Sequence, residues 1–224
     1  YYDREYFADV RGKKFRRPNG SEDHWGYKNP EGEFLGAKPI AQAWDIIFRP
    51  ETMLDAGAGR GVFVAYARDC DIKAEGFDFS EWAVNEGRYH RCSAEWLRVH
   101  DATKPWPYSD QGFDLIVCLD TLEHIYFDDL NAVIDEMYRV AKKWVFLEIA
   151  TVDGVREKGY RLKRGEPIPL DRDARTWAGH VTVETQEFWM EQLDREDWVP
   201  RRDLVNWFRA LVDPKIIKNW RTII

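Results

Sequence analysis

Three glycines stand at alternate positions directly after a short apolar segment. The stretch MLDAGAGRG, residues 53–61, places Asp55 two residues before Gly57, and Gly59 and Gly61 follow. Because glycine has no Cβ, the backbone can turn sharply there and approach a ligand closely. In open parallel sheets the space beyond the carboxyl ends of the first strands binds nucleotide-like ligands. The spacing therefore predicts a loop that binds a nucleoside.

Acidic residues follow at the ends of later segments. Asp78, in GFDFS, stands where a carboxylate can accept hydrogen bonds from two vicinal ribose hydroxyls. An aspartate that merely begins a turn is the structural alternative for this position. Asp101 lies in HDATKPWPYS and Asp120 in DTLEHI, each directly after a segment that we expect to be a strand. The order of these acids along the chain favours a nucleoside ligand.

Strand patterns alternate with helix patterns through the middle of the chain, which predicts a parallel sheet with helices on both faces, a doubly wound α/β fold. The β-branched run FDLIVCL is the clearest strand, of the kind that is covered on both faces. Ser80 is the expected N-cap of one helix. We predict helices over residues 37–48, 62–68, 81–89 and 128–142, and strands over 52–56, 72–79, 96–99, 113–119 and 144–149.

One domain, 1–224, is expected from the length of the chain. We divide it into an N-terminal lid segment, a cofactor-binding core, an insertion or substrate cap after the fifth strand, and C-terminal helix and strand elements, which are residues 1–36, 37–150, 151–180 and 181–224. The insertion is rich in charge, glycine and proline, and loops of this length are often functional. In the last part we predict a helix from 183 or 185 to 193, a helix near 204–212, and strands over 198–203 and 220–224.

The glycine loop resembles the first motif of the class I S-adenosylmethionine-dependent methyltransferases, in which an acidic residue precedes alternating glycines. DAGAGRG matches that motif in full, and the resemblance extends over residues 54–149. It implies a Rossmann-like methyltransferase fold. The rival is a dinucleotide-binding oxidoreductase, whose fingerprint is G-x-G-x-x-G. Counted from Gly57, the third glycine position of that fingerprint holds Val62, so the methyltransferase is favoured.

The resemblance implies S-adenosyl-L-methionine as the cofactor. It places Asp55 at the cationic amino end of the cofactor, Asp78 at the ribose and Asp101 at the adenine amino group. Trp25, Tyr27, Trp82 and Trp106 are aromatic candidates for the sulfonium, since aromatic faces stabilise cations, although core packing is the commoner role of a tryptophan. The full expected cofactor set is Asp55, Gly57, Ala58, Gly59, Gly61, Asp78, Phe79, Asp101, Ala102, Leu119 and Asp120.

Two histidines are the candidate catalytic residues. His124 follows the fourth strand, where the resemblance implies that the cofactor sulfur faces the substrate, and an imidazole can remove a proton near neutral pH. We predict that it is a general base or orients the substrate; a structural histidine is the alternative. His180 is the second candidate and has an equal chance of being a turn residue. Glu123 and Glu148 are weaker options.

The composition of the chain indicates which kinds of binding partner to expect. Acidic residues outnumber basic ones, 40 to 33, and the net charge is −7, so nucleic acid is not the expected partner. We expect methyl transfer to a hydroxyl or amine of a small molecule such as a sugar, a natural product or another metabolite. A methyltransferase acting on tRNA or protein is the alternative, because basic residues gather over residues 11–17. A non-catalytic nucleotide-binding domain is a further one.

The three cysteines lack the paired spacing of zinc sites or disulfide frameworks, so no metal is expected. No apolar run is long enough for a membrane span, and the first residues lack the apolar core of a signal peptide. We therefore expect a cytoplasmic protein with no membrane partner. The oligomeric state and the methyl acceptor are not determined by the sequence.

Overall fold

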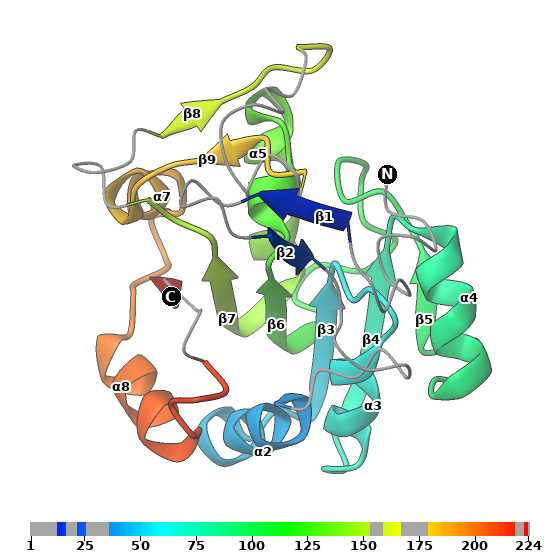
Figure 1. Ribbon diagram of the computed structural model, residues 1–224. Helices are drawn as coiled ribbons and strands as arrows, with labels where there is room; N and C mark the ends of the chain where they lie inside the picture. Colours follow the sequence, from blue (N-terminus) through cyan, green and yellow to red (C-terminus); the bar gives the residue numbers. More distant parts are fainter. Residues whose placement is uncertain are drawn as a thin grey trace.

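A six-stranded sheet forms the centre of the molecule (Figure 1). The computed structural model describes residues 13–16, 22–25, 36–152, 159–166, 179–217 and 222–223. The strand order is β10-β7-β6-β3-β4-β5, in which β10 is antiparallel to β7 and the other neighbours are parallel. The strands are β3 (Thr52–Ala56), β4 (Lys73–Asp78), β5 (Leu97–Val99), β6 (Phe113–Leu119), β7 (Ala141–Ile149) and β10 (Thr222–Ile223). The predicted doubly wound α/β fold is confirmed.

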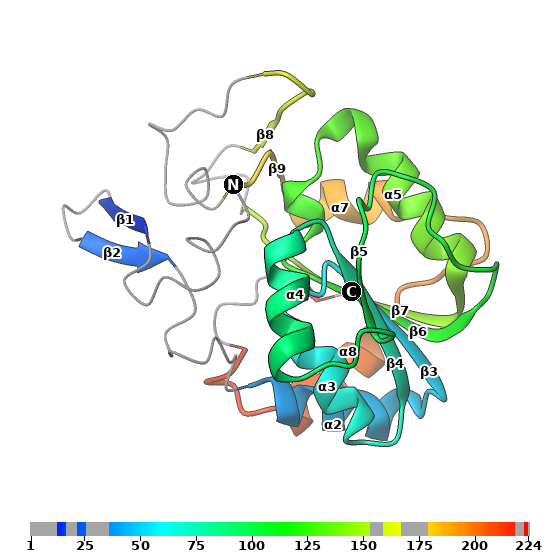
Figure 2. The same ribbon diagram turned by 90° about the vertical axis from the view of Figure 1, so that its right-hand side faces the viewer.

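Helices cover both faces of the sheet (Figures 1 and 2). One face packs against α2 (Ala37–Phe48), α3 (Val62–Arg68), α4 (Glu81–His90) and α8 (Arg202–Leu211), and the other against α5 (Phe127–Val140) and α7 (Gln186–Gln192). The Ser80 side chain caps α4, because its hydroxyl accepts a hydrogen bond from the Ala83 N–H at 3.1 Å. None of the helices in the described part of the chain has the length and apolar composition needed to cross a membrane.

The alternation of side chains along β6 produces two cores. Leu115 and Val117 point into the cluster that contains α2 and α3, whereas Ile116 and Cys118 point into the cluster that contains α5. All four side chains are buried, as expected for a central parallel strand with helices on both faces. This burial fixes the strand register, and the register determines which residues stand at the carboxyl ends of the strands.

Two small antiparallel pairs lie outside the main sheet. β1 (Lys13–Arg16) pairs with β2 (Glu22–Trp25) in the predicted lid segment, and β8 (Tyr160–Arg161) pairs with β9 (Thr182–Val183). In Figure 1, β8 and β9 lie above the arrowheads of the central strands. We refer to residues 159–166 and 179–183 as the cap. Residues 159–166 and 179–180 belong to the predicted insertion, whereas residues 181–183 lie just after it and include β9, so Val183 lies in a strand instead of at the start of a helix.

Two sequence expectations about element boundaries are wrong. Helix α5 ends at Val140, although the pattern predicts helix to residue 142, because Ala141 already pairs with Phe113 and is buried in the sheet. Tertiary pairing thus overrides the helical periodicity. The expected strand over 198–203 does not form either: α8 begins at Arg202, and Val199 is 76% exposed and has no apolar core to face.

Candidate active site

The glycine loop connects β3 to α3, and its glycines adopt backbone conformations that other residues avoid. Gly57, Gly59 and Gly61 have φ values of 85°, 53° and 69°. A Cβ at Gly57 would stand 2.1 Å from the Thr121 hydroxyl oxygen, and one at Gly61 would stand 2.7 Å from the Cys92 sulfur. Close packing against the segment after β6 therefore requires glycine at position 57 in addition to the backbone conformation.

Asp78, at the end of β4, fastens this loop. Its Oδ2 accepts a hydrogen bond from the Gly59 N–H at 2.8 Å, and its Oδ1 accepts one from the Ser80 N–H at 2.7 Å. The N–H groups of Gly57 and Ala58 both donate to the Phe77 carbonyl, at 3.0 and 2.9 Å. A carboxylate has about four acceptor positions, so the two that these bonds leave can receive hydroxyl donors of a ligand.

Asp55 is a buried acid with an unsatisfied oxygen. Its side chain is 2% exposed, and Oδ2 has no hydrogen-bond partner among the described residues. Burial, with the nearby charge of Asp78, raises the pKa of Asp55 to about 8. A buried carboxyl of this kind is stabilised by a cation, so this acceptor beside the loop fits the amino end of an S-adenosylmethionine molecule.

The adenine side of the expected site lies at the ends of β4 and β5. Phe79 follows Asp78 directly and is 67% exposed, so its ring is accessible to a ligand. Asp101 forms a local turn in which Oδ1 accepts hydrogen bonds from the N–H and hydroxyl of Thr103, at 2.9 and 2.8 Å. The Ala102 carbonyl accepts a bond from the Trp106 indole N–H at 3.0 Å.

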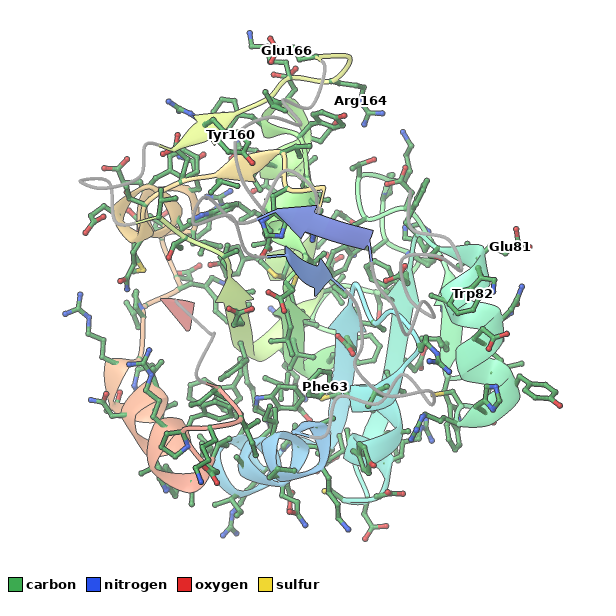
Figure 3. The ribbon with its side chains drawn as sticks, in the orientation of Figure 1. Phe63, Glu81, Trp82, Tyr160, Arg164 and Glu166 are labelled. Carbon is green, nitrogen blue, oxygen red and sulfur yellow. The ribbon has the colours of Figure 1, made fainter. Side chains whose placement is uncertain are left out.

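Of the aromatic candidates for the sulfonium, Trp106 is wrong and the other three stay predictions. Trp106 is buried, and its ring centroid lies 4.8 Å from that of Phe77 within the core, so it packs and presents no open face. Trp82 is half-buried on α4 (Figure 3). The side chain of Trp25 and the whole of Tyr27 lie outside the described residues.

The structure brings the two candidate catalytic histidines together. The rings of His124, in η1 (Leu122–His124), and His180 meet edge to face with centroids 4.6 Å apart. His124 Nδ1 lies 3.2 Å from the Gly179 carbonyl oxygen, to which it can donate. Burial lowers the pKa of His124 to about 4, so the ring is neutral at pH 7. A neutral imidazole with so low a pKa suits the orientation of a substrate better than removal of a proton.

Three further carboxyls interact with one another near the ends of β6 and β7, and the sequence pattern assigned only minor roles to two of them. Asp120 follows β6, Glu123 lies in η1, and Glu148 is the second-last residue of β7. Burial, and then the charge of Asp120, raises the pKa of Glu123 to about 8 and that of Glu148 to about 11. The sequence could have predicted this grouping, because acids at the ends of neighbouring parallel strands share one edge of the sheet.

The cap is attached to the segment that follows β6. The Val181 N–H donates to the Glu123 carbonyl at 2.8 Å, and the Thr182 hydroxyl donates to the Ile125 carbonyl at 2.8 Å. The Tyr160 hydroxyl donates to the His180 carbonyl at 3.2 Å. Figure 3 shows Tyr160 in this layer, with Arg164 and Glu166 farther out. Both candidate histidines thus lie where the cap meets the carboxyl edge of the sheet.

Metal ligation finds no support in the described part of the chain, which contains no group of three or more His, Cys, Asp or Glu side chains placed to hold an ion. Two hollows, of about 550 and 440 Å³, lie elsewhere. The first is at the amino ends of β3 and β4, around Glu51 and Lys73. The second lies between the middle of β7 and the start of α8, around Trp144 and Leu204.

The chain is similar to one protein family and to several solved structures. The methyltransferase domain family matches residues 32–211. The PH0226 protein of Pyrococcus horikoshii OT3 is 27% identical over 44% of this chain and 49% of its own, about half its length, with a TM-score of 0.41. A SAM-dependent methyltransferase of Thermotoga maritima is 18% identical over 71% and 69%, with a TM-score of 0.48. SAM-bound CalS10, an amino pentose methyltransferase of Micromonospora echinaspora, is 17% identical over 50% and 49%, with a TM-score of 0.44.

The sheet and the glycine loop define a Rossmann-like nucleoside-binding enzyme fold, and the domain match covers most of the chain. The chain belongs to the methyltransferase domain family.

Proposed function

We propose that this chain transfers a methyl group from S-adenosylmethionine to a hydroxyl or amine of a small molecule at the carboxyl edge of β3, β4, β6 and β7. The observation that carries the proposal is the Asp78 carboxylate, which fastens the glycine loop through Gly59 while Asp55 lies buried beside it with an unsatisfied oxygen. An adenosyl group with a cationic amino end matches both features.

The cofactor contacts follow from this arrangement. Asp78 receives the ribose hydroxyls, Asp55 faces the amino end, and Phe79 provides an exposed ring for the adenine. The proposed set is Asp55, Gly57, Ala58, Gly59, Gly61, Asp78, Phe79, Asp101, Ala102 and Leu119, with Asp120 at the boundary between cofactor and acceptor.

S-adenosylmethionine supplies a methyl group that is already activated. The chain must therefore align the acceptor with the methyl, exclude water and receive one proton. His124 is neutral and lies against His180 under the cap, so it supports the proposal as the residue that orients the acceptor. The net charge of −7 and the cap over this edge favour a small acceptor over nucleic acid.

Binding of S-adenosylhomocysteine tests the cofactor assignment. Isothermal titration calorimetry on the wild-type protein is expected to give binding of S-adenosylhomocysteine and none of NADH. Asp78→Asn should weaken the affinity for S-adenosylhomocysteine by about 10- to 100-fold, because it removes a charged acceptor for the ribose and for the Gly59 N–H. Asp69→Asn, an exposed position at the other end of α3, makes the same charge change and should leave the affinity unchanged. Binding of NADH alone would refute the proposal.

His124→Ala tests the acceptor side. Labelled methyl transfer from S-adenosylmethionine to a metabolite extract is expected to fall about tenfold or more, because the acceptor loses an orienting partner. The affinity for S-adenosylhomocysteine should stay within about twofold of the wild type. His90→Ala, on the exposed face of α4, is the matched control. Turnover unchanged by His124→Ala would remove this histidine from the acceptor site.

A further inference from the structure

Three carboxyl groups meet where β6 and β7 end. Leu119 pairs with Glu148 in the sheet register, and the Asp120 N–H donates to the Glu148 carbonyl at 3.1 Å. The Asp120 and Glu148 side chains are hydrogen-bonded to each other. Glu123 interacts electrostatically with both. We refer to Asp120, Glu123 and Glu148 as the carboxyl cluster.

The cluster contains buried oxygens that lack partners. Glu123 and Glu148 are 0% and 2% exposed. Glu123 Oε1 accepts the Ala150 N–H at 3.0 Å, whereas Oε2 of Glu123 and Oε2 of Glu148 have no hydrogen-bond partner among the described residues. Among the described side chains, no lysine or arginine forms an ion pair with an acid of the cluster. Unsatisfied buried carboxyls are costly, so the site is suited to a ligand that brings N–H donors and positive charge.

The cluster is accessible through Asp120, which is exposed while the other two acids lie beneath it. Its position in the sheet separates it from the adenosyl side. The order is β7-β6-β3-β4, with the glycine loop after β3, Asp78 at the end of β4, and the cluster at the ends of β6 and β7. His124 follows Glu123 directly, and the Val181 N–H of the cap donates to the Glu123 carbonyl. The acids therefore stand on the acceptor side of the site.

We propose that the methyl acceptor is an amine, which binds as an alkylammonium ion with its N–H groups directed at the carboxyl cluster. This inference rests on the proposed function and assigns the acceptor class that the function leaves open between hydroxyl and amine. Asp120 receives the ammonium at the entrance, and the unpartnered oxygens of Glu123 and Glu148 accept its remaining donors.

The cluster also provides a destination for the proton. The Asp120 carboxylate takes one proton from R–NH₃⁺ and becomes a carboxylic acid, which leaves R–NH₂ with its lone pair on nitrogen. The new N–C bond forms as the C–S bond of the sulfonium breaks, and the bonding pair stays on sulfur. The product R–NH₂⁺–CH₃ retains the positive charge, and the carboxylic acid later releases its proton to water. Atoms and charge balance without another reactant.

An alkylammonium is also present in the cofactor, so the test must distinguish the two sources. Affinities are measured by calorimetry, with S-adenosylhomocysteine alone and then with amines added to its complex with the protein. The amine probes are phenethylamine, tryptamine and glucosamine, each compared with its hydroxyl counterpart: 2-phenylethanol, tryptophol and glucose. At least one amine is expected to bind ten or more times as tightly as its counterpart.

Asp120→Asn is the principal variant, because Asp120 has φ 46° and asparagine tolerates this left-handed conformation. It should weaken amine binding at least tenfold, and by a larger factor than it weakens S-adenosylhomocysteine, because Asp120 stands at the boundary between cofactor and acceptor. Glu148→Gln is the second variant; it should weaken amine binding at least tenfold and leave the affinity for S-adenosylhomocysteine within twofold. Asp128→Asn, an exposed acid on α5, is the matched control and should change neither affinity.

The outcomes separate the two proposals. If the wild-type protein does not bind S-adenosylhomocysteine, the proposed function fails. If it binds S-adenosylhomocysteine but no amine binds better than its hydroxyl counterpart, the amine inference alone is overturned. If Asp120→Asn weakens S-adenosylhomocysteine as much as the amine, the cluster serves the cofactor, and the inference is overturned in that case too.

Discussion

Replacing Gly57 with alanine is expected to abolish measurable binding of S-adenosylhomocysteine, a loss of more than about 100-fold, and to lower the free energy of unfolding by about 2 to 4 kcal/mol. Gly57 has φ 85°, which strains any residue with a Cβ. The added Cβ would also stand 2.1 Å from the Thr121 hydroxyl oxygen. The loop and the segment after β6 must then separate, and both border the proposed site. Calorimetry and urea unfolding measure the two effects.

Gly165→Ala is the matched control, because Gly165 has φ 90° and an added Cβ would meet nothing within 4 Å. This variant should lower the free energy of unfolding only by the backbone strain, about 1 to 2 kcal/mol, and leave the binding of S-adenosylhomocysteine intact. The double variant Gly57→Ala with Thr121→Gly removes the clashing atoms and should recover part of the lost stability. Normal binding by Gly57→Ala alone would show that the loop need not pack against Thr121.

The stability of the protein is expected to fall as the pH rises from about 5 to about 8. The pKa of Glu123 is about 8 in the folded chain against an ordinary value of 4.5, and the pKa of Asp55 is about 8 against 3.8. Between these values the folded state binds more protons than the unfolded state, so the free energy of unfolding decreases with pH. At about 1.4 kcal/mol for each unit of pKa shift, Glu123 alone accounts for about 2 to 4 kcal/mol.

Glu123→Gln isolates this contribution, since glutamine resembles the protonated acid and keeps an acceptor for the Ala150 N–H. The variant should be more stable than the wild type at pH 8 and lose most of that advantage at pH 5, as measured by urea unfolding across the pH range. Asp114 affects stability in the opposite direction. Lys143 and the N–H groups of Glu51 and Thr52 lower its pKa, so its contribution to the free energy of unfolding is lost as the pH falls. Parallel pH profiles of Glu123→Gln and the wild type would contradict the assignment.

Local patterns predicted most of the core elements well. Helix α2 and strands β3 and β6 have the predicted boundaries, because each is an uninterrupted periodic or apolar run with a clear break at its ends. The errors lie where distant contacts decide. Residues 141–142 continue the helical pattern but join β7, because β6 offers a partner for pairing. No local pattern could reveal that partner.

The candidate site divides in the same way. The order of Asp55, the glycines, Asp78 and Asp101 was visible in the sequence, because each lies at or after the carboxyl end of a strand and parallel strands bring those ends to one edge. The proximity of His124 and His180 was not visible, since 55 residues separate His124 from the Gly179 carbonyl beside it. For Trp106 the sequence suggested a role that the structure does not support. A tryptophan can bind a cation, but this side chain is buried in the core.

By itself the sequence determined the class of fold and the glycine loop, because these depend on periodicity and on backbone freedom at Gly57, Gly59 and Gly61, which are local properties. Only the tertiary structure decided the protonation states and the grouping of the acids and histidines near the cap. The pKa values of Asp55, His124 and the carboxyl cluster are set by burial and by neighbouring charges. Those neighbours come together only when β6, β7 and the cap are in place.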